Sequence, residues 1–307
     1  ITQYSNSRCL CSRSRYSRRT WKHFEYYCGK KLGVFYSWAT TITLIFVMAV
    51  LISGAGATLS EYYGVNHYVG ALIMAIMILI AYLLGFEKLI KILGFIGPSI
   101  ICFCLLIGLI TCFRDFDNMP QVADYADNLA KSQASPNWII SSLLYVSYNF
   151  LCGSTYYTAL GASCASKKEA RVGAFVGAVG LILAIAVMNT AIIVNAGDTA
   201  SLAIPTLYLA KKISYLLGAV FSIFLILGIY SSCSAMMWTV TTKFATGDKK
   251  KDRFIAIGVA LGTFILGLFS FSELIGLFYP IIGYAGVIFI ACVFYRRYSS
   301  KGRDKAI

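Results

Sequence analysis

Eight long apolar runs, separated by short polar segments, make up most of the chain after residue 33. Each has roughly the 17 to 25 residues that a helix needs to cross the hydrocarbon layer of a bilayer. None shows the alternation of apolar and polar residues that is typical of an outer-membrane barrel strand. We therefore predict an all-α, polytopic membrane protein. Its predicted spans are 34–57, 68–86, 89–113, 138–161, 173–195, 215–238, 254–271 and 274–295.

Lysine and arginine are unevenly distributed between the segments that join these runs. If the N-terminus is cytoplasmic, the inner segments hold 23 of the 27 lysines and arginines, and the outer segments hold four. Positively charged residues collect in cytoplasmic loops, and an error of one span would destroy this alternation. The pattern predicts a multi-pass membrane protein with both termini in the cytoplasm.

The N-terminal 32 residues differ from the rest of the chain, because they are polar and basic and have no apolar period. They also lack the continuous apolar core of a secretory signal. We therefore divide the chain into a polar N-terminal segment (1–32), a transmembrane domain (33–297) and a cytoplasmic tail (298–307).

The composition agrees with a membrane protein, since 58% of the residues are hydrophobic and 13% are charged. The net charge of +14 does not indicate a nucleic-acid partner, because the cations form short clusters between apolar runs. Most cysteines lie in or beside apolar runs, and the two histidines show no zinc spacing. No phosphate-binding loop and no nucleophile with a nearby base is apparent. We expect no enzyme activity, no metal and no cofactor.

The stretch YVSYNFLCGST, residues 145–155, contains several polar residues inside an otherwise apolar run. Polar groups at membrane depth need an internal partner or a water-lined cavity, and a spanning helix can unwind at a glycine beside small hydroxyl residues. Interrupted helices of this kind form transport sites. The candidate solute-binding residues are Tyr145, Asn149, Gly153, Ser154 and Thr155. Alternatively, Asn149 bonds to a neighbouring helix and Gly153 allows two helices to pack closely.

Three other features of the sequence bear on packing or binding. Ser231 and Ser232 lie where hydroxyls could complete an oxygen shell around sodium, although such hydroxyls also bond to carbonyls of their own helix. The small-residue strip ISGAGAT at 52–58 favours close helix packing. The link 196–214 predicts a short surface helix with Pro205 in its first turn and lysines reaching the interface, either as a gate cover or as a plain linker.

Several blocks of the sequence resemble the YkvI-type family of bacterial membrane proteins. They are CGKKLGVFYSWATTITLIFVMAVLISGAGATLSEYYG, GFEKLIKILGFIGP, NWIISSLLYVSYNF and IPTLYLAKKI, and the resemblance covers about residues 26–297. The family is placed in the amino acid–polyamine–organocation superfamily, whose members have two inverted five-helix repeats, the LeuT-type fold. The resemblance implies a secondary transporter of a small, amino-acid-like solute, coupled to Na⁺ or H⁺. A non-transporting, ligand-sensing subunit like those of spore germination receptors is the alternative.

On that fold, the eight runs correspond to helices three to ten. Residues 33–113 would be the remainder of the first repeat, and 137–297 would be the second repeat. We accordingly expect 8 of 10 spans, from a truncated or frameshifted coding region, without the first helix that supplies half of the solute site. The resemblance favours a solute-facing role for the candidates in 145–155 and an ion-binding role for Ser231 and Ser232. The expected partners are the lipid bilayer and a small solute.

Overall fold

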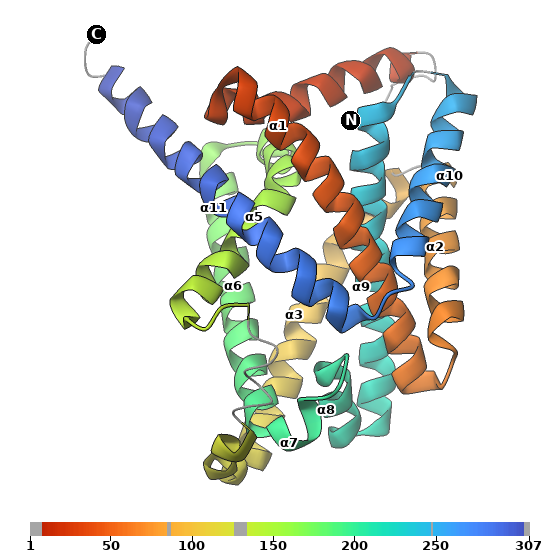
Figure 1. The fold of residues 1–307 in the computed structure, drawn as a ribbon, viewed down its shortest axis with the longest axis vertical. Helices are drawn as coiled ribbons and strands as arrows, with labels where there is room; N and C mark the ends of the chain where they lie inside the picture. The colour runs from red at the N-terminus through yellow and green to blue at the C-terminus, as the bar shows by residue number, and fades with distance from the viewer. Residues whose placement is uncertain (1–7, 85–86, 126–133, 247, 304–307) are drawn as a thin grey trace.

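All eight apolar runs form helices over most of their length, as predicted (Figure 1). The computed structural model describes residues 8–84, 87–125, 134–246 and 248–303, and these ranges contain no strand. The long helices are α1 (Arg8–Tyr63), α2 (His67–Leu84), α3 (Glu87–Asp115), α5 (Trp138–Ser163), α6 (Lys167–Val194), α9 (Tyr215–Phe244), α10 (Lys249–Leu266) and α11 (Phe271–Arg303). The short ones are the 3₁₀ helix η1 (Phe116–Tyr125), α7 (Ala196–Thr199) and α8 (Pro205–Ile213).

Several of these helices can cross a membrane. Within the described residues, five are long and apolar enough: His23–Tyr63, Ile96–Tyr125, Lys167–Val194, Tyr215–Phe244 and Phe271–Arg296. The apolar helix His67–Leu83 is shorter. This arrangement supports a multi-pass helical membrane protein, while the count of eight spans remains a prediction.

Helix α1 is the centre of the bundle. In its most apolar stretch 72% of the residues are buried, against 22% or less in the other four candidate spans. Met48 of α1 packs with α2, α9 and α10, Leu44 packs with α5, α9 and α11, and Tyr62 packs with α3, α6, α8 and α9. Because α1 and α9 contribute to all three apolar clusters, the other helices are arranged around this pair.

The small-residue strip of α1 serves close packing, as predicted. A Cβ atom added at Gly54 would lie 2.9 Å from the ring of Phe271, and one at Gly56 would lie 2.6 Å from the carbonyl oxygen of His67. Ser53 donates a hydrogen bond of 2.9 Å to the carbonyl of Phe269. The absence of larger side chains on this face therefore lets neighbouring segments approach the backbone of α1.

The N-terminal part of α1 lies across one end of the bundle (Figure 1). It is separated from the rest of α1 by Gly29, whose φ of +79° is in the region that favours glycine. Phe24 is fully buried before this turn, and its ring centre lies 5.1 Å from that of Phe289 on α11. The segment upstream of residue 32 therefore contributes to the core through Phe24.

The link between α6 and α9 forms the predicted short helix, α8, with Pro205 in its first turn. Leu207, Leu209 and Ala210 on α8 are buried. They belong to the apolar cluster that α8 shares with α1, α3, α6 and α9. This link is thus packed on the bundle, at the end where η1 and α7 also lie (Figure 1).

Helices α5 and α11 contact each other through two glycines of α11. A Cβ atom at Gly283 would lie 3.0 Å from Leu144, and one at Gly286 would collide with the backbone of Ser147. Pro280 lies in the same helix, which continues through it. The two helices therefore meet backbone to backbone along this contact.

Gly286→Ala is expected to destabilise the protein by about 1–3 kcal/mol, because the added methyl group overpacks the contact with Ser147. Gly276→Ala, also on α11, is the matched control, since a Cβ there meets nothing within 4 Å. Alanine at that position should be neutral or should stabilise the helix by about 1 kcal/mol. Thermal unfolding in detergent measures both variants, and equal midpoints would contradict the close contact of α5 with α11.

Candidate functional site

Helix α5 is continuous from Trp138 to Ser163, so the predicted interruption at Gly153 is wrong. Several of its polar side chains instead find partners within the helix. Asn149 donates to the carbonyl of Tyr145 at 2.9 Å, and Ser154 donates to the carbonyl of Leu151 at 2.8 Å. Hydroxyl and amide groups bonded in this way need no opening of the backbone.

The five predicted solute-binding residues differ in burial. Ser154 and Thr155 are each 5% exposed, whereas Tyr145 is 41% exposed. Asn149 and Gly153 are half-buried, and the ring of Tyr157 occupies the space beside Gly153. The fold thus directs Ser154 and Thr155 into the bundle and leaves Tyr145 near its surface.

Two hydroxyls on the buried side of α5 lack a hydrogen-bond partner among the described residues, those of Ser147 and Thr155. Ser147 is fully buried. An unsatisfied buried polar group costs about 1–3 kcal/mol, and in native proteins it often marks a place that water or a ligand occupies. The sequence pattern identified Thr155 but missed Ser147, although both lie in the stretch of α5 that starts at Tyr145.

The predicted ion-binding residues, Ser231 and Ser232, do not contact the candidate residues of α5 through any described hydrogen bond. Ser231 is half-buried and Ser232 is exposed on α9. They lie between Tyr230 and Cys233, which belong to the cluster of α1, α2, α9 and α10. No described hydrogen bond joins either serine to α5. The structure therefore does not bring the two sets of candidates together.

Lys243 fastens α9 to α1 at the predicted cytoplasmic end. Its ammonium group donates to the carbonyl of Ser37 and, at 2.9 Å each, to the hydroxyls of Ser37 and Thr41. It also lies 4.3 Å from the centre of the Trp38 ring. A cation over an indole ring is stabilised by about 0.5–2 kcal/mol. Lys243 is thus held by oxygen atoms and an aromatic face of one helix.

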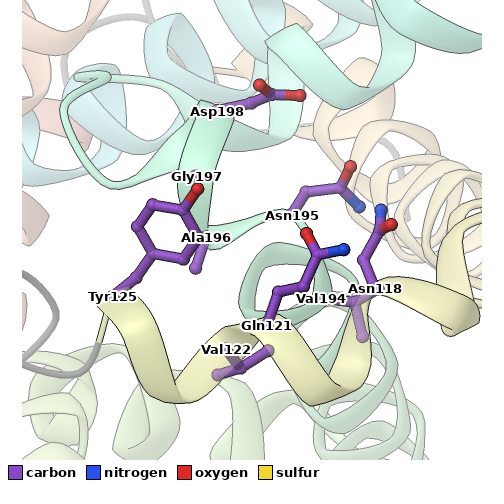
Figure 2. Close-up of a pocket in the computed structure, with 9 residues that line it drawn as sticks. All are labelled: Asn118, Gln121, Val122, Tyr125, Val194, Asn195, Ala196, Gly197 and Asp198. Atoms are coloured by element: carbon purple, nitrogen blue, oxygen red, sulfur yellow. The ribbon is translucent and has the colours of Figure 1, made fainter.

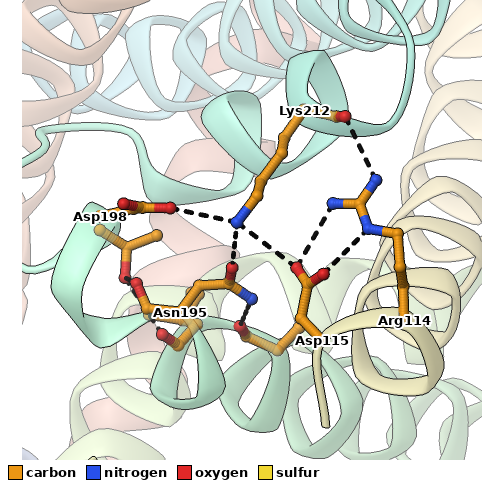
Figure 3. Close-up of polar contacts among 8 residues, drawn as sticks. Arg114, Asp115, Asn195, Asp198 and Lys212 are labelled. Atoms are coloured by element: carbon orange, nitrogen blue, oxygen red, sulfur yellow. Dashed lines mark hydrogen bonds and ion pairs between the residues drawn. The ribbon is translucent and has the colours of Figure 1, made fainter. Parts of the chain in front are cut away.

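A charged network occupies the opposite end, where α3, α6, α7 and α8 meet (Figure 3). Lys212 of α8 donates to Asn195 at 2.6 Å and to Asp198 at 3.1 Å, and its ammonium lies 3.5 Å from Asp115. Arg114 pairs with Asp115 at 2.9 Å and donates to the carbonyl of Lys212 at 3.3 Å. Lys212 therefore connects α8 to three other segments instead of reaching only toward the interface.

The environment of Lys212 changes its pKa. Partial burial alone would lower this pKa, but the hydrogen bond to Asp198 and the charges of Asp115 and Asp198 raise it above the ordinary lysine value of 10.5. The ammonium form is therefore favoured throughout the physiological pH range. Lys212 contributes a permanent positive charge to this end of the protein.

A polar pocket lies beside this network, between η1 and α7 (Figure 2). It has about 120 Å³ of space for the centres of water molecules. The residues that line it are Asn118, Gln121, Val122, Tyr125, Val194, Asn195, Ala196, Gly197 and Asp198. Two lining residues, Asn195 and Asp198, also bind Lys212. No local sequence signal predicts this pocket, because its walls come from segments about 70 residues apart.

Lys212→Met is expected to lower the free energy of unfolding by about 1 kcal/mol, because two of its partners are partly exposed. Since the folded state raises the pKa of Lys212, its contribution is complete below about pH 10.5 and is lost as the pH rises through the raised pKa. Thermal unfolding against pH should show the wild type and the variant converging at high pH.

Lys211→Met is the matched control, because Lys211 is not part of the network. Its ammonium group lies over the ring of Tyr62, 5.9 Å from the ring centre. An equal loss in both variants, or a difference for Lys212→Met that does not change with pH, would contradict the role of the network.

The sequence is similar to a curated bacterial protein over most of its length. That protein is the uncharacterized membrane protein YkvI of Bacillus subtilis (strain 168), which is 22% identical over 280 residues, 86% of this chain and 73% of the relative. No family model and no solved structure matches the chain. Together with the apolar helices, this similarity supports a YkvI-like, multi-pass membrane protein.

Proposed function

We propose that the protein is a secondary transporter that moves a small, amino-acid-like solute by alternating access. The observation that carries this proposal is the pair of buried hydroxyls on α5, Ser147 and Thr155, whose hydrogen-bonding capacity is unused among the described residues. A solute with polar groups would satisfy them during its passage. An entirely structural helix at this position would gain stability from apolar residues instead.

The spacing of the two hydroxyls favours a path over a single binding point. Thr155 lies eight positions after Ser147, which corresponds to about 12 Å along a helix. A solute of amino-acid size cannot contact both at once. We infer that they mark successive positions along α5, with Thr155 nearer the predicted cytoplasmic side.

The distribution of polar contacts is compatible with alternating access. The middle of the bundle is held by apolar clusters, whereas Lys212 and Lys243 hold its two ends through hydrogen bonds and charge. Polar contacts at a wet boundary can be exchanged for water at low cost, so one end can open while the apolar middle stays packed. We propose that the two lysine contacts open in alternation.

The fold and the coupling ion belong to the same proposal. The resemblance described above supports a LeuT-type inverted repeat, with α5 as the first helix of the second repeat. In that arrangement Ser231 and Ser232 would contribute to a Na⁺ site, and coupling to H⁺ is the other form of the proposal. Movement of Ser231 toward α5 during transport would be required for direct coupling.

Thr155→Val is expected to reduce solute uptake at least tenfold without loss of thermal stability. The two side chains have similar shapes, and removing an unpaired buried hydroxyl leaves stability unchanged or increases it by about 1 kcal/mol. Uptake of radiolabelled amino acids into proteoliposomes, with imposed Na⁺ or H⁺ gradients, measures the effect. Thr158→Val is the control, because Thr158 only donates to the carbonyl of Ser154.

Wild-type uptake by Thr155→Val would contradict the placement of the solute path on α5. Saturable binding without uptake by the wild type would refute transport and would support the alternative of a ligand-sensing subunit.

A further inference from the structure

The pocket between η1 and α7 has the size and chemistry of a second binding site, separate from the hydroxyls of α5. A water molecule needs roughly 10–15 Å³ of such space, so about 120 Å³ accommodates a solute of several non-hydrogen atoms. Tyr125 forms one wall, and its hydroxyl lies 2.8 Å from the point where a Cβ of residue 197 would be. Gly197 therefore leaves room for the tyrosine against α7, and a larger residue there would displace it.

The walls of the pocket offer both hydrogen-bond donors and acceptors. The amides of Asn118 and Gln121 point toward Asn195 across the pocket (Figure 2). Each amide has an N–H donor pair and a carbonyl acceptor. Neither the Asn118 nor the Gln121 side chain forms a hydrogen bond within the part of the chain that the structure describes. Their capacity is therefore available to a molecule in the pocket.

The charges near the pocket balance one another. Arg114 and Lys212 are positive, Asp115 and Asp198 are negative, and the four groups are joined in one network (Figure 3). This arrangement gives no net attraction for an anion or a cation. Of these four groups only Asp198 lines the pocket, together with uncharged amides and the Tyr125 hydroxyl. One carboxylate beside uncharged donors suits a solute that is neutral overall but has its own positive and negative groups.

We propose that this pocket is a second solute site, which binds a small zwitterion such as a free amino acid at the predicted outer face. Asn118, Gln121 and the Tyr125 hydroxyl would donate to its carboxylate, and Asp198 would accept from its ammonium group. Because Asn195 and Asp198 also hold Lys212, occupancy of the pocket is linked to the position of α8. If this pocket is where a solute enters the transport path, that role rests on the proposed transport function. The binding of a zwitterion in the pocket does not depend on it.

Hydrogen–deuterium exchange with peptide resolution tests the pocket directly, because it reports on η1 and α7 separately from α5. The probes are glycine, L-alanine, L-serine and L-glutamine at millimolar concentration, with acetate and methylammonium as singly charged comparisons. In the wild type, at least one zwitterion should slow exchange in residues 116–125 and 195–199 at least threefold, in a saturable manner. Acetate and methylammonium should have no such effect.

Two variants impair binding in the pocket by different means. Gln121→Met deletes an amide while keeping a similar length, and Gly197→Val fills the space beside Tyr125. Both should abolish the protection or weaken the affinity about tenfold. Asp124→Asn, on η1 but outside the pocket lining, and Thr155→Val, on α5, should keep it. Unchanged exchange of α2 and α10 shows that each variant is folded.

The proposal is overturned if none of the four zwitterions protects η1 and α7, or if Gln121→Met binds like the wild type. The outcome is independent of the transport test. Protection without uptake would keep the pocket and refute transport, whereas uptake without protection would refute the pocket and keep transport.

Discussion

Inside an apolar helix bundle, every polar group has to find its hydrogen-bond partner within the protein or in bound water and solute. Most hydroxyls of the long helices meet this requirement locally, as Thr58, Ser154 and Thr241 do by donating to carbonyls three or four residues earlier. Lys212 and Lys243 meet it by reaching oxygen atoms of other helices. Four buried hydroxyls do neither among the described residues, those of Thr40, Thr111, Ser147 and Thr155. Because two of the four lie on α5, we place the solute path along that helix.

The same requirement explains how the bundle is divided. The centre is apolar and closely packed around α1, where Gly54 and Gly56 let Phe271 and the chain at His67 approach. Two charged contacts of the described residues hold opposite ends of the bundle, the network around Lys212 and the contact of Lys243 with α1. A change of state that opens one end exchanges polar contacts that water can replace, and at the Lys212 end it also moves buried residues of α8 that belong to an apolar cluster.

The helices were predictable from the sequence because apolar runs of this length allow few alternatives, and Pro205 marked the start of α8 correctly. The small-residue strip of α1 was also predictable, since small side chains at this spacing leave the backbone accessible. The interruption at Gly153 was predicted wrongly, because the side chains of Asn149 and Ser154 bond within the helix. The network of Asp115 with Lys212 had no local signal, because those residues are distant in the sequence and meet only after folding.

The central claim is that α5 carries a solute path. The most direct measurement is an experimental density map of the protein, prepared once with and once without a solute that it takes up. The account predicts solute density within hydrogen-bonding distance of the hydroxyl of Thr155 or Ser147, which disappears when the solute is omitted. Solute density elsewhere in the bundle, with both hydroxyls bonded only to protein groups, would contradict it.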